Sequence, residues 1–201
     1  MKGKQFTASR KLWEFKAVLY DRLRSGPIIK SIYQEELRSL QSLFPSEPAQ
    51  FHLDLGCGTG SSFSLYTHST HLFLADVSMR MLHLARRKRP AAHAICLDAG
   101  VPLPFKTGSF DLITAIGLVE YIADVSHLLR ELWRVAKPAA WLVVTASPAN
   151  VLTVLRIFTG SRPKPHNPET FQLRLIQTGW TVCKQQTTPM QLQWLCRKPG
   201  E

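Results

Sequence analysis

The sequence predicts one α/β domain over residues 1–201, with a Rossmann-like, mostly parallel sheet of seven strands, an antiparallel last strand and helices on both faces. Strand-like and helix-like segments alternate over residues 51–146, which is typical of βαβ units. The first strand-like run ends in a glycine-rich turn, as in α/β folds that bind nucleotides. The 201 residues, 45% of them hydrophobic, can bury one sizeable core and are too few for two ordinary domains.

The N-terminal part is expected to be helical. Apolar residues recur at helical spacing over residues 11–44, with a break at Gly26-Pro27, so we expect two helices joined by a turn. An exposed apolar stripe of this length would promote aggregation. We therefore expect residues 1–48 to form a helical lid, residues 49–147 the binding core, and residues 148–201 a substrate-side segment.

The elements of the core follow in order along the chain. Apolar runs bounded by turn residues predict strands at 51–55, 71–76, 93–97, 111–116 and 140–146. Helical spacing predicts helices at about 60–66, 78–89 and 124–136. After them we expect a short helix near 150–158, a Pro-rich loop at 162–168, a helix at 169–178 and a C-terminal antiparallel hairpin.

The charge balance fits a protein with anionic partners. The chain carries 25 Lys and Arg against 14 Asp and Glu, a net charge of +11, which suits nucleic acid, a membrane surface or an acidic small molecule. Its four cysteines form no C-x-x-C pair, which favours reduced thiols. No apolar stretch approaches the length of a membrane span, and residues 1–10 lack the apolar core of a signal peptide. We therefore expect a cytoplasmic protein.

Three strands are expected to end in a carboxylate near a glycine loop. Asp54-Leu-Gly-Cys-Gly-Thr-Gly60 follows the first strand, Asp76 ends the second and Asp98 follows the third. Glycines allow a sharp turn and a close approach of a ligand, and the carboxyl ends of parallel strands meet at one edge of the sheet. A carboxylate at the position of Asp76 can accept hydrogen bonds from a ribose diol. Helix capping is the alternative for Asp76 and Asp98 individually.

The charge at the loop favours a cationic ligand. A dinucleotide pyrophosphate avoids a nearby carboxylate, and Asp54 stands at the mouth of the loop. A dehydrogenase fingerprint would need a third glycine where Ser61 stands, and the chain has neither a Tyr-x-x-x-Lys pair nor a P-loop. The sulfonium of S-adenosylmethionine fits better. No Cys, Asp or Glu stands at ligand spacing beside His68 and His71, so we expect no metal site.

Several motifs in order resemble one family. They are Leu53–Gly60, Ala75–Leu82, the segment from Asp98 to Ile113 that includes Leu103-Pro-Phe and Ser109-Phe-Asp, and Leu128–Pro138. In these motifs the chain resembles the class I S-adenosylmethionine-dependent methyltransferases, and within them the small type 11 group that includes quinone and lipid methyltransferases. The resemblance is strong over residues 51–147 and looser over the tail.

The resemblance implies positions for the methionine half of the cofactor. Gly56, Cys57, Gly58 and Gly60 would lie under the methionine moiety, with Asp54 near its ammonium group. Behind that moiety the chain would pass at Ile116 and Gly117. A tyrosine in the N-terminal lid, Tyr20, would lie against the cofactor.

The resemblance also implies positions for the nucleoside half. Asp76 would bind the ribose hydroxyls, while Val77 and Met81 would flank the adenine. Asp98 would meet the adenine amino group, with Ala99 beside it. One departure concerns a turn and not the cofactor site: the family usually reads Lys-Pro-Gly-Gly before its fifth strand, where this chain has Lys137-Pro-Ala-Ala140.

Residues on the acceptor side have weaker signals. Glu120 and Tyr121 follow the fourth strand, where the nucleophile should approach, and a helix cap or rim residue is the alternative for each. His166 precedes the last helix, where the family often carries a substrate-side histidine, and its usual pKa suits a general base. We therefore treat Glu120, Tyr121 and His166 as candidate catalytic residues.

These features predict methyl transfer from S-adenosylmethionine to a small, apolar or anionic acceptor, resembling a quinone or lipid. The segment Ala115–Tyr121 contains no Asn/Asp-Pro-Pro-Tyr/Phe run, which argues against methylation of an exocyclic amine. The basic ends suggest a peripheral membrane or anionic contact. Two alternatives remain: an RNA methyltransferase, favoured by the charge but lacking an appended RNA-binding module, and a catalytically inactive binding or scaffold protein of the same fold.

Overall fold

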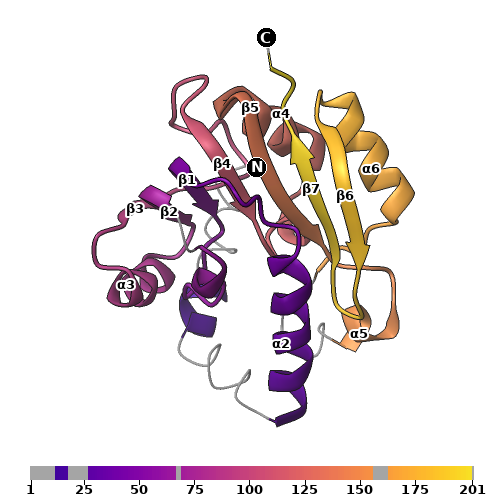
Figure 1. Cartoon of the computed structure of the whole chain (residues 1–201). Helices are drawn as coiled ribbons and strands as arrows, with labels where there is room; N and C mark the ends of the chain where they lie inside the picture. Colours follow the sequence, from indigo (N-terminus) through magenta and orange to yellow (C-terminus); the bar gives the residue numbers. More distant parts are fainter. Residues whose placement is uncertain (1–11, 18–26, 67–68, 156–162, 201) are drawn as a thin grey trace.

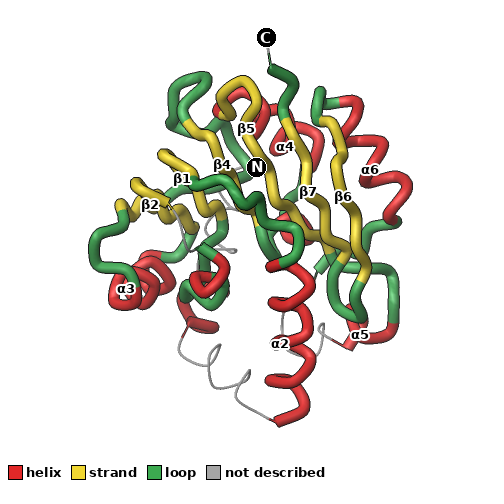
Figure 2. The backbone as a smooth tube through the Cα atoms, viewed as in Figure 1, coloured by secondary structure: helices red, strands yellow, loops and turns green. Residues whose placement is uncertain are grey.

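One sheet of seven strands forms the centre of the protein (Figures 1 and 2). The computed structural model describes residues 12–17, 27–66, 69–155 and 163–200. The strands are β1 (Ala49–Leu55), β2 (Ser69–Asp76), β3 (His93–Cys96), β4 (Phe110–Ala115), β5 (Ala136–Ala146), β6 (Thr181–Thr187) and β7 (Leu192–Arg197). Their order across the sheet is β3-β2-β1-β4-β5-β7-β6. The pairs within β1 to β5 are parallel, and β7 runs antiparallel to both β5 and β6. The predicted fold class is confirmed.

Helices cover both faces of this sheet. The helical segments are residues 12–17, α2 (Pro27–Gln41), α3 (Met79–Lys88), α4 (Val125–Val135), α5 (Val151–Leu155) and α6 (Pro168–Gln177), with single 3-10 turns η1 (Phe63–Leu65) and η2 (Val119–Tyr121). Ser78, Asp124 and Asn167 cap α3, α4 and α6 by accepting a hydrogen bond from a backbone N–H three residues on. These caps satisfy amides that have no partner within the helix.

One sequence prediction about the helices was wrong. Residues 60–66 were expected to form a helix, but only the 3-10 turn η1 forms there. Gly60 has a φ of 74°, a left-handed conformation that cannot belong to a right-handed helix. The residues expected to form the first turn of this helix therefore belong to the glycine loop instead.

The alternation of side chains along the strands divides the core in two. On one face, α4 and α6 bury a cluster that includes Leu53, Leu128, Phe171 and Trp180. On the other face, a second cluster gathers residues of α2, α3 and η1 around Leu74. Burying each such large apolar side chain contributes about 1.5–3 kcal/mol. Both clusters leave the carboxyl ends of the parallel strands available for a site.

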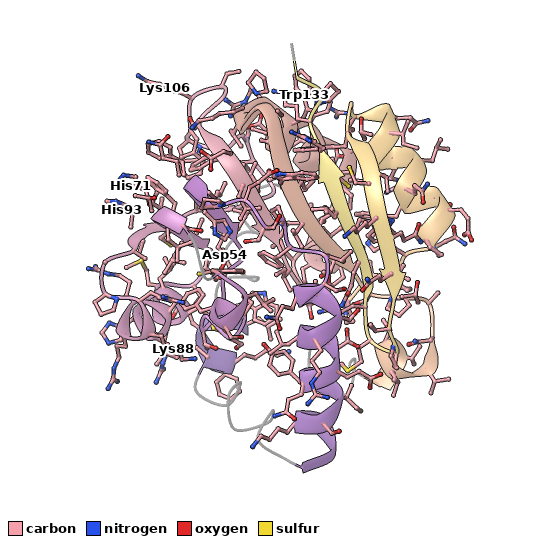
Figure 3. All side chains as sticks on the ribbon, in the orientation of Figure 1. Asp54, His71, Lys88, His93, Lys106 and Trp133 are labelled. Atoms are coloured by element: carbon pink, nitrogen blue, oxygen red, sulfur yellow. The ribbon has the colours of Figure 1, made fainter. Side chains whose placement is uncertain are left out.

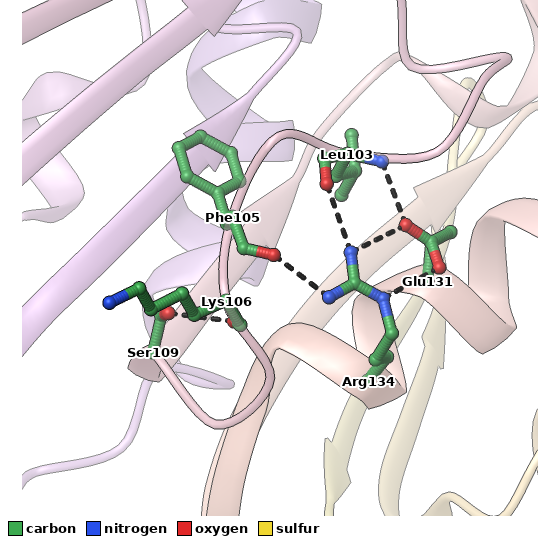
Figure 4. Close-up of polar contacts among 6 residues, drawn as sticks. All are labelled: Leu103, Phe105, Lys106, Ser109, Glu131 and Arg134. Carbon is green, nitrogen blue, oxygen red and sulfur yellow. Dashed lines mark hydrogen bonds and ion pairs between the residues drawn. The ribbon is translucent and has the colours of Figure 1, made fainter.

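The long segment between β3 and β4 is fastened to α4 by one arginine (Figure 4). The Arg134 guanidinium donates hydrogen bonds to the carbonyl oxygens of Leu103 (2.9 Å) and Phe105 (2.8 Å) and to the Glu131 carboxylate. Glu131 in turn accepts a hydrogen bond from the Leu103 N–H at 2.7 Å. The planar guanidinium satisfies several acceptors at once, so the segment that follows Asp98 has a fixed course.

A buried carboxylate holds α2 against the C-terminal hairpin. Glu36 accepts hydrogen bonds from the Thr188 hydroxyl (2.5 Å) and the Met190 N–H (3.1 Å), both in the turn between β6 and β7. Burial raises the pKa of Glu36 above its usual value. In Figure 1, α2 extends from this attachment past the carboxyl ends of the strands. The helix thereby forms a wall beside the region where the site lies.

The first residues of β5 contain an irregularity. The pairing with β4 shifts between Phe110↔Ala136 and Leu112↔Trp141, and Ala139 lies in the extra length with a φ of 58°. Ala139 is the first alanine of Lys137-Pro-Ala-Ala140, where the resembling family carries glycine. A Cβ in this left-handed region costs about 1–2 kcal/mol, so this chain carries local strain there.

We predict that Ala139→Gly stabilises the protein by about 0.5–1 kcal/mol, because the relief of strain exceeds the extra chain entropy of glycine. Thermal unfolding should show a midpoint higher by about 1–3 °C. Ala140→Gly is the matched control, since Ala140 is a buried residue of β5 with no positive φ, and it should destabilise. A lower midpoint for Ala139→Gly would show that its backbone is not strained.

Candidate cofactor and acceptor site

The glycine loop follows β1 and is hydrogen-bonded to the end of β2. Gly56, Gly58 and Gly60 have φ values of 74°, 53° and 74°, which L residues rarely adopt. The N–H groups of Gly56 and Cys57 both donate hydrogen bonds to the carbonyl oxygen of Ala75, at 2.7 and 3.1 Å. The loop is therefore a tight turn held against the neighbouring strand.

The three glycines do not have the same surroundings. A Cβ built on Gly60 would lie 2.3 Å from the Phe63 ring, and one on Gly56 would touch Leu118 at 3.0 Å. A Cβ on Gly58 or on Gly117 would meet no heavy atom within 4 Å. Gly56 and Gly60 thus allow the protein to pack, whereas Gly58 and Gly117 border open space in which a ligand can approach the backbone.

Asp76 ties the loop to α3. Its Oδ2 accepts a hydrogen bond from the Gly58 N–H (2.9 Å) and its Oδ1 one from the Ser78 N–H (2.9 Å). Burial raises the pKa of this carboxyl, and these backbone donors oppose the shift. A carboxylate has about four acceptor positions, so the two amide bonds leave capacity for the pair of hydroxyls of a ribose.

Asp54 lies in the interior beneath the loop (Figure 3), with 1% of its surface exposed. Its Oδ1 accepts a hydrogen bond from the Thr114 hydroxyl at 2.9 Å, while Oδ2 is buried without a hydrogen-bond partner. Burial raises the pKa of Asp54 to about 7. A buried acceptor of this kind is costly unless it is paired, so the site suits a ligand that brings a cationic donor.

The predicted nucleoside residues lie past the ends of β2 and β3. Val77 is partly exposed, whereas Met81, in the first turn of α3, is fully buried. Asp98 is partly exposed and its Oδ1 accepts a hydrogen bond from the Gly100 N–H at 2.8 Å, next to the buried Ala99. Asp98 Oδ1 therefore stabilises the turn at residues 98–100, and Oδ2 can still accept a hydrogen bond from a ligand.

The residues Ile116 and Gly117, predicted to pass behind the methionine moiety, directly follow β4. The N–H of Gly117 donates a hydrogen bond to the Thr145 hydroxyl at 2.8 Å, and Ile116 packs against the cluster on the α2 and α3 face. Tyr20, the lid residue expected at the cofactor, lies outside the described residues. Because β4 is the neighbour of β1 in the sheet, Ile116 and Gly117 lie beside the glycine loop that follows β1.

Residues 12–17 extend over this edge of the sheet. The Trp13 and Tyr121 rings meet edge to face with centroids 5.0 Å apart. Glu14 is close enough to Asp76 to raise the pKa of that carboxyl further. One short helical segment therefore lies near both Asp76, predicted to bind the cofactor, and Tyr121, predicted to lie on the acceptor side.

The candidate acceptor residues Glu120 and His166 are brought together by Ser147. The Ser147 hydroxyl donates a hydrogen bond to Glu120 Oε1 at 2.9 Å, and the Ser147 carbonyl oxygen accepts one from the His166 N–H at 2.9 Å. The carbonyl oxygen of Glu120 accepts a third from the Lys164 N–H at 2.8 Å. Segments from three parts of the chain thus converge at the ends of β4 and β5.

His166 is held as a neutral base. Its ring packs edge to face on Phe171, with centroids 5.4 Å apart, and its buried Nε2 has no hydrogen-bond partner among the described residues. Burial lowers the pKa of His166 below its usual value, although the nearby Glu120 opposes this shift. The imidazole is therefore uncharged near neutral pH and can accept a proton.

Several residues of the site were missed by sequence reasoning. Thr114, Thr145 and Ser147 hold Asp54, the Gly117 amide and Glu120 in place. Thr114 lies on β4, Thr145 near the end of β5 and Ser147 directly after it. The only sequence signal for them was a polar residue next to a run of apolar residues. Among the described residues, no three His, Cys, Asp or Glu side chains are placed to hold a metal, and no helix is long and apolar enough to cross a membrane.

The open space above Gly58 leads to a test of the site. Gly58→Ala should leave the fold intact, at a cost of about 1–2 kcal/mol for the left-handed backbone, but weaken S-adenosylhomocysteine binding at least tenfold in calorimetry because the Cβ enters the ligand's space. Gly60→Ala is the comparison, since its Cβ meets Phe63, and it should lower the melting temperature markedly more. Equal affinity of Gly58→Ala and the unmodified protein would place the ligand elsewhere.

Comparison with known proteins agrees with this geometry. Residues 53–144 match the methyltransferase domain family Methyltransf_11. The demethylmenaquinone methyltransferase of Streptomyces griseus is 32% identical over 108 residues, which are 53% of this chain and 46% of that protein. The 18S rRNA (guanine(1575)-N(7))-methyltransferase of Saccharomyces cerevisiae is 33% identical over 95 residues, 45% of this chain and 34% of that protein. The chain spans less than half the length of these two relatives.

A solved structure shows the same fold over almost the whole chain. The magnesium protoporphyrin IX methyltransferase of Synechocystis PCC 6803, crystallised with bound SAH, superposes with a TM-score of 0.74 and 19% identity, over 96% of this chain and 99% of that one. The family match covers the glycine loop, Asp76 and Asp98. Residues 53–144 are therefore similar to the methyltransferase domain family, and the chain has the fold of this solved methyltransferase structure.

Proposed function

We propose that this protein transfers a methyl group from S-adenosylmethionine to a small-molecule acceptor. The observation that supports this most is the arrangement at the ends of β1 to β3. Asp54 and Asp76 lie at the carboxyl ends of β1 and β2, Asp98 follows β3, and the left-handed glycine loop follows β1. Parallel strands deliver their carboxyl ends to one edge, and the open space at Gly58 and Gly117 leaves room for the methionine half of the cofactor.

Each residue has a definite task toward the cofactor. Asp76 would accept hydrogen bonds from the ribose hydroxyls while its amide partners fix its orientation. Asp54, with its unpaired buried Oδ2, would bind the ammonium of the methionine moiety. Val77, Met81, Asp98 and Ala99 would border the adenine. When bound, the cofactor supplies an electrophilic methyl carbon on a positively charged sulfur.

His166 is proposed to remove the proton of the acceptor. Methyl transfer is a displacement at carbon: the acceptor's electron pair forms the new bond while the carbon–sulfur pair returns to sulfur. If the acceptor atom carries a proton, a neutral base must take it, and His166 Nε2 is such a base. Glu120 and Tyr121, in the segment after β4, would orient the His166 ring and the acceptor.

The surroundings of these residues favour an apolar acceptor. Val151, Leu152 and Val154 of α5 are exposed, as is Phe15 at 70%, and Figure 1 shows α5 and residues 12–17 beyond the carboxyl ends of the strands. Apolar side chains there suit a greasy substrate. The buried carboxylate of Glu120 disfavours an anionic group at the reacting centre. Lys30 and Lys164 are exposed cations that could meet an anionic part farther out or a membrane surface.

RNA is the second candidate acceptor. One relative acts on 18S rRNA, and the net charge of +11 suits a polyanion. Incubation with labelled S-adenosylmethionine and either demethylmenaquinol or rRNA separates the two candidates by which product carries the label. RNA binding that falls steeply with salt, together with label in rRNA, would favour RNA over a small acceptor. Cofactor binding with no transfer to any acceptor would favour an inactive binding protein.

We predict that Asp76→Asn weakens S-adenosylhomocysteine binding at least tenfold, because a hydrogen bond to a charged group contributes about 1.5–3 kcal/mol. Titration calorimetry measures this loss. Glu169→Gln, an exposed carboxylate on α6, is the matched control and should bind as the unmodified protein does. If both variants bound equally well, Asp76 would not contact the ribose.

We also predict that transfer depends on neutral His166. Below its pKa the ring is protonated and cannot accept the acceptor's proton, so the rate should fall as pH falls; because burial lowers this pKa, the rate should be flat from pH 7 to 8. His166→Gln should reduce kcat about 10²–10⁴-fold and leave S-adenosylhomocysteine affinity unchanged. An unaltered pH profile in His166→Gln would exclude it as the base.

A further inference from the structure

A group of polar side chains is buried beneath the glycine loop. His52 and Asp54 lie on the same face of β1, and Thr114 is the partner of Asp54 across the β1–β4 pair. All three are almost fully buried. Buried polar groups are retained at a cost unless they are hydrogen-bonded. Thr114 holds Asp54 in place, but the proposed site gives no role to His52, whose burial requires an explanation.

These side chains form a continuous chain of hydrogen bonds. Ser69 Oγ is 3.0 Å from His52 Nδ1, and His52 Nε2 is 3.0 Å from Thr114 Oγ1. Thr114 Oγ1 is in turn 2.9 Å from Asp54 Oδ1. The Leu53 carbonyl oxygen, at 3.5 Å from the same hydroxyl, is too far to compete. The chain runs from the partly exposed start of β2 to the carboxyl group under the loop.

The charge of Asp54 dictates the direction of every bond. An ionised carboxylate only accepts, so Thr114 must donate to it and His52 Nε2–H must donate to Thr114. His52 Nδ1 then accepts from Ser69. Burial lowers the pKa of His52 to about 3, so the ring is neutral and carries a single ring proton.

A protonated Asp54 allows the opposite direction. Asp54 then donates to Thr114, Thr114 donates to His52 Nε2, and His52 carries its proton on Nδ1 and donates to Ser69. Both arrangements satisfy every link with the same heavy-atom positions. The two differ only in the direction of the hydroxyl protons and in the tautomer of one imidazole.

We propose that Ser69, His52 and Thr114 form a relay that reverses direction with the charge of Asp54, and that cofactor binding drives it into the direction in which Asp54 is a carboxylate. The proton lost by Asp54 passes to Thr114, the Thr114 proton passes to His52 Nε2, and the Nδ1 proton leaves through Ser69 to solvent. Protons and charge balance, because the ligand's ammonium replaces the departing proton. His52 and Thr114 are thus positioning residues that act through Asp54.

The charges around Asp54 agree with this coupling. Burial is the main cause that raises its pKa to about 7, with Asp76 adding to the shift, while Thr114 and the Tyr66 hydroxyl lower it. Burial also raises the pKa of the Cys57 thiol and of the Tyr66 hydroxyl, so both stay neutral. Asp76 is then the other carboxylate that faces Asp54, and a cation has no competing positive charge among these groups.

The first test measures protons released on binding. The inference rests on the proposed function, so S-adenosylhomocysteine and S-adenosylmethionine are the ligands, and each is titrated calorimetrically in buffers of different ionisation enthalpy. Because a site with a pKa of about 7 must deprotonate, we expect release of about half a proton at pH 7 and affinity about tenfold weaker at pH 6 than at pH 8. No binding of either ligand would reject the proposed function itself; binding without proton release would reject the relay alone.

The second test observes His52 directly. In protein labelled with 15N-histidine, the His52 ring signals, identified by their absence in His52→Gln, should report the Nδ1–H tautomer at pH 6 and the Nε2–H tautomer at pH 8, with a midpoint near 7 and no charged form. Saturating S-adenosylhomocysteine should give the Nε2–H tautomer at both pH values. One tautomer throughout would overturn the proposal.

Variants of Thr114 separate the relay from simple packing. Thr114→Val keeps the shape but breaks the chain, so the His52 tautomer should no longer follow pH, and binding at pH 7 should weaken about tenfold because Asp54 loses the donor that stabilises its charge. Thr114→Ser restores the hydroxyl and should recover both properties. Recovery of stability without recovery of the tautomer change would mean that Thr114 only fills space.

Discussion

The contacts of one carboxylate support most of the proposed cofactor site. Asp76 accepts hydrogen bonds from the Gly58 N–H, inside the glycine loop, and from the Ser78 N–H, at the start of α3. A turn whose glycines all have positive φ has many accessible shapes, and this pair of bonds selects one of them. The same bonds place the carboxylate between the loop and α3. The orientation of Asp76 that stabilises the fold is therefore also the orientation proposed to bind a ribose. The loop, α3 and the end of β2 therefore form one unit.

The sheet, its flanking helices and the glycine loop could be predicted because each has a short sequence pattern. Alternating apolar runs give the sheet and its flanking helices, because burial on one face imposes a period on each element. The glycine loop and its carboxylates lie at strand ends that the same patterns locate. The helix expected at 60–66 does not form, although the apolar spacing there favours one. Gly60 has a left-handed backbone conformation and packs closely against Phe63, and this conformation is incompatible with a right-handed helix.

The acceptor side could be named only in part from sequence, since it depends on long-range contacts. Hydrogen bonds from the Ser147 hydroxyl and from the backbone bring together Glu120, Ser147 and His166, which lie in separate segments. No local sequence pattern predicts contacts of this kind. The His52–Thr114–Asp54 chain was missed for a similar reason: it depends on the register between β1 and β4. Family resemblance identifies what is shared by many methyltransferases, and the acceptor is where they differ, as the quinone and rRNA relatives illustrate.

The attachment of α2 by Glu36 has a consequence for the order in which the protein can fold. The bonded partners Glu36 and Thr188 are 152 residues apart in sequence, so this contact closes a long loop of the chain. During synthesis, the turn that binds α2 emerges 152 residues after Glu36. Until then the apolar side chains of α2 lack one of their neighbours, and the wall that α2 forms beside the site is missing. Binding competence should therefore arise only after the β6–β7 hairpin closes on α2.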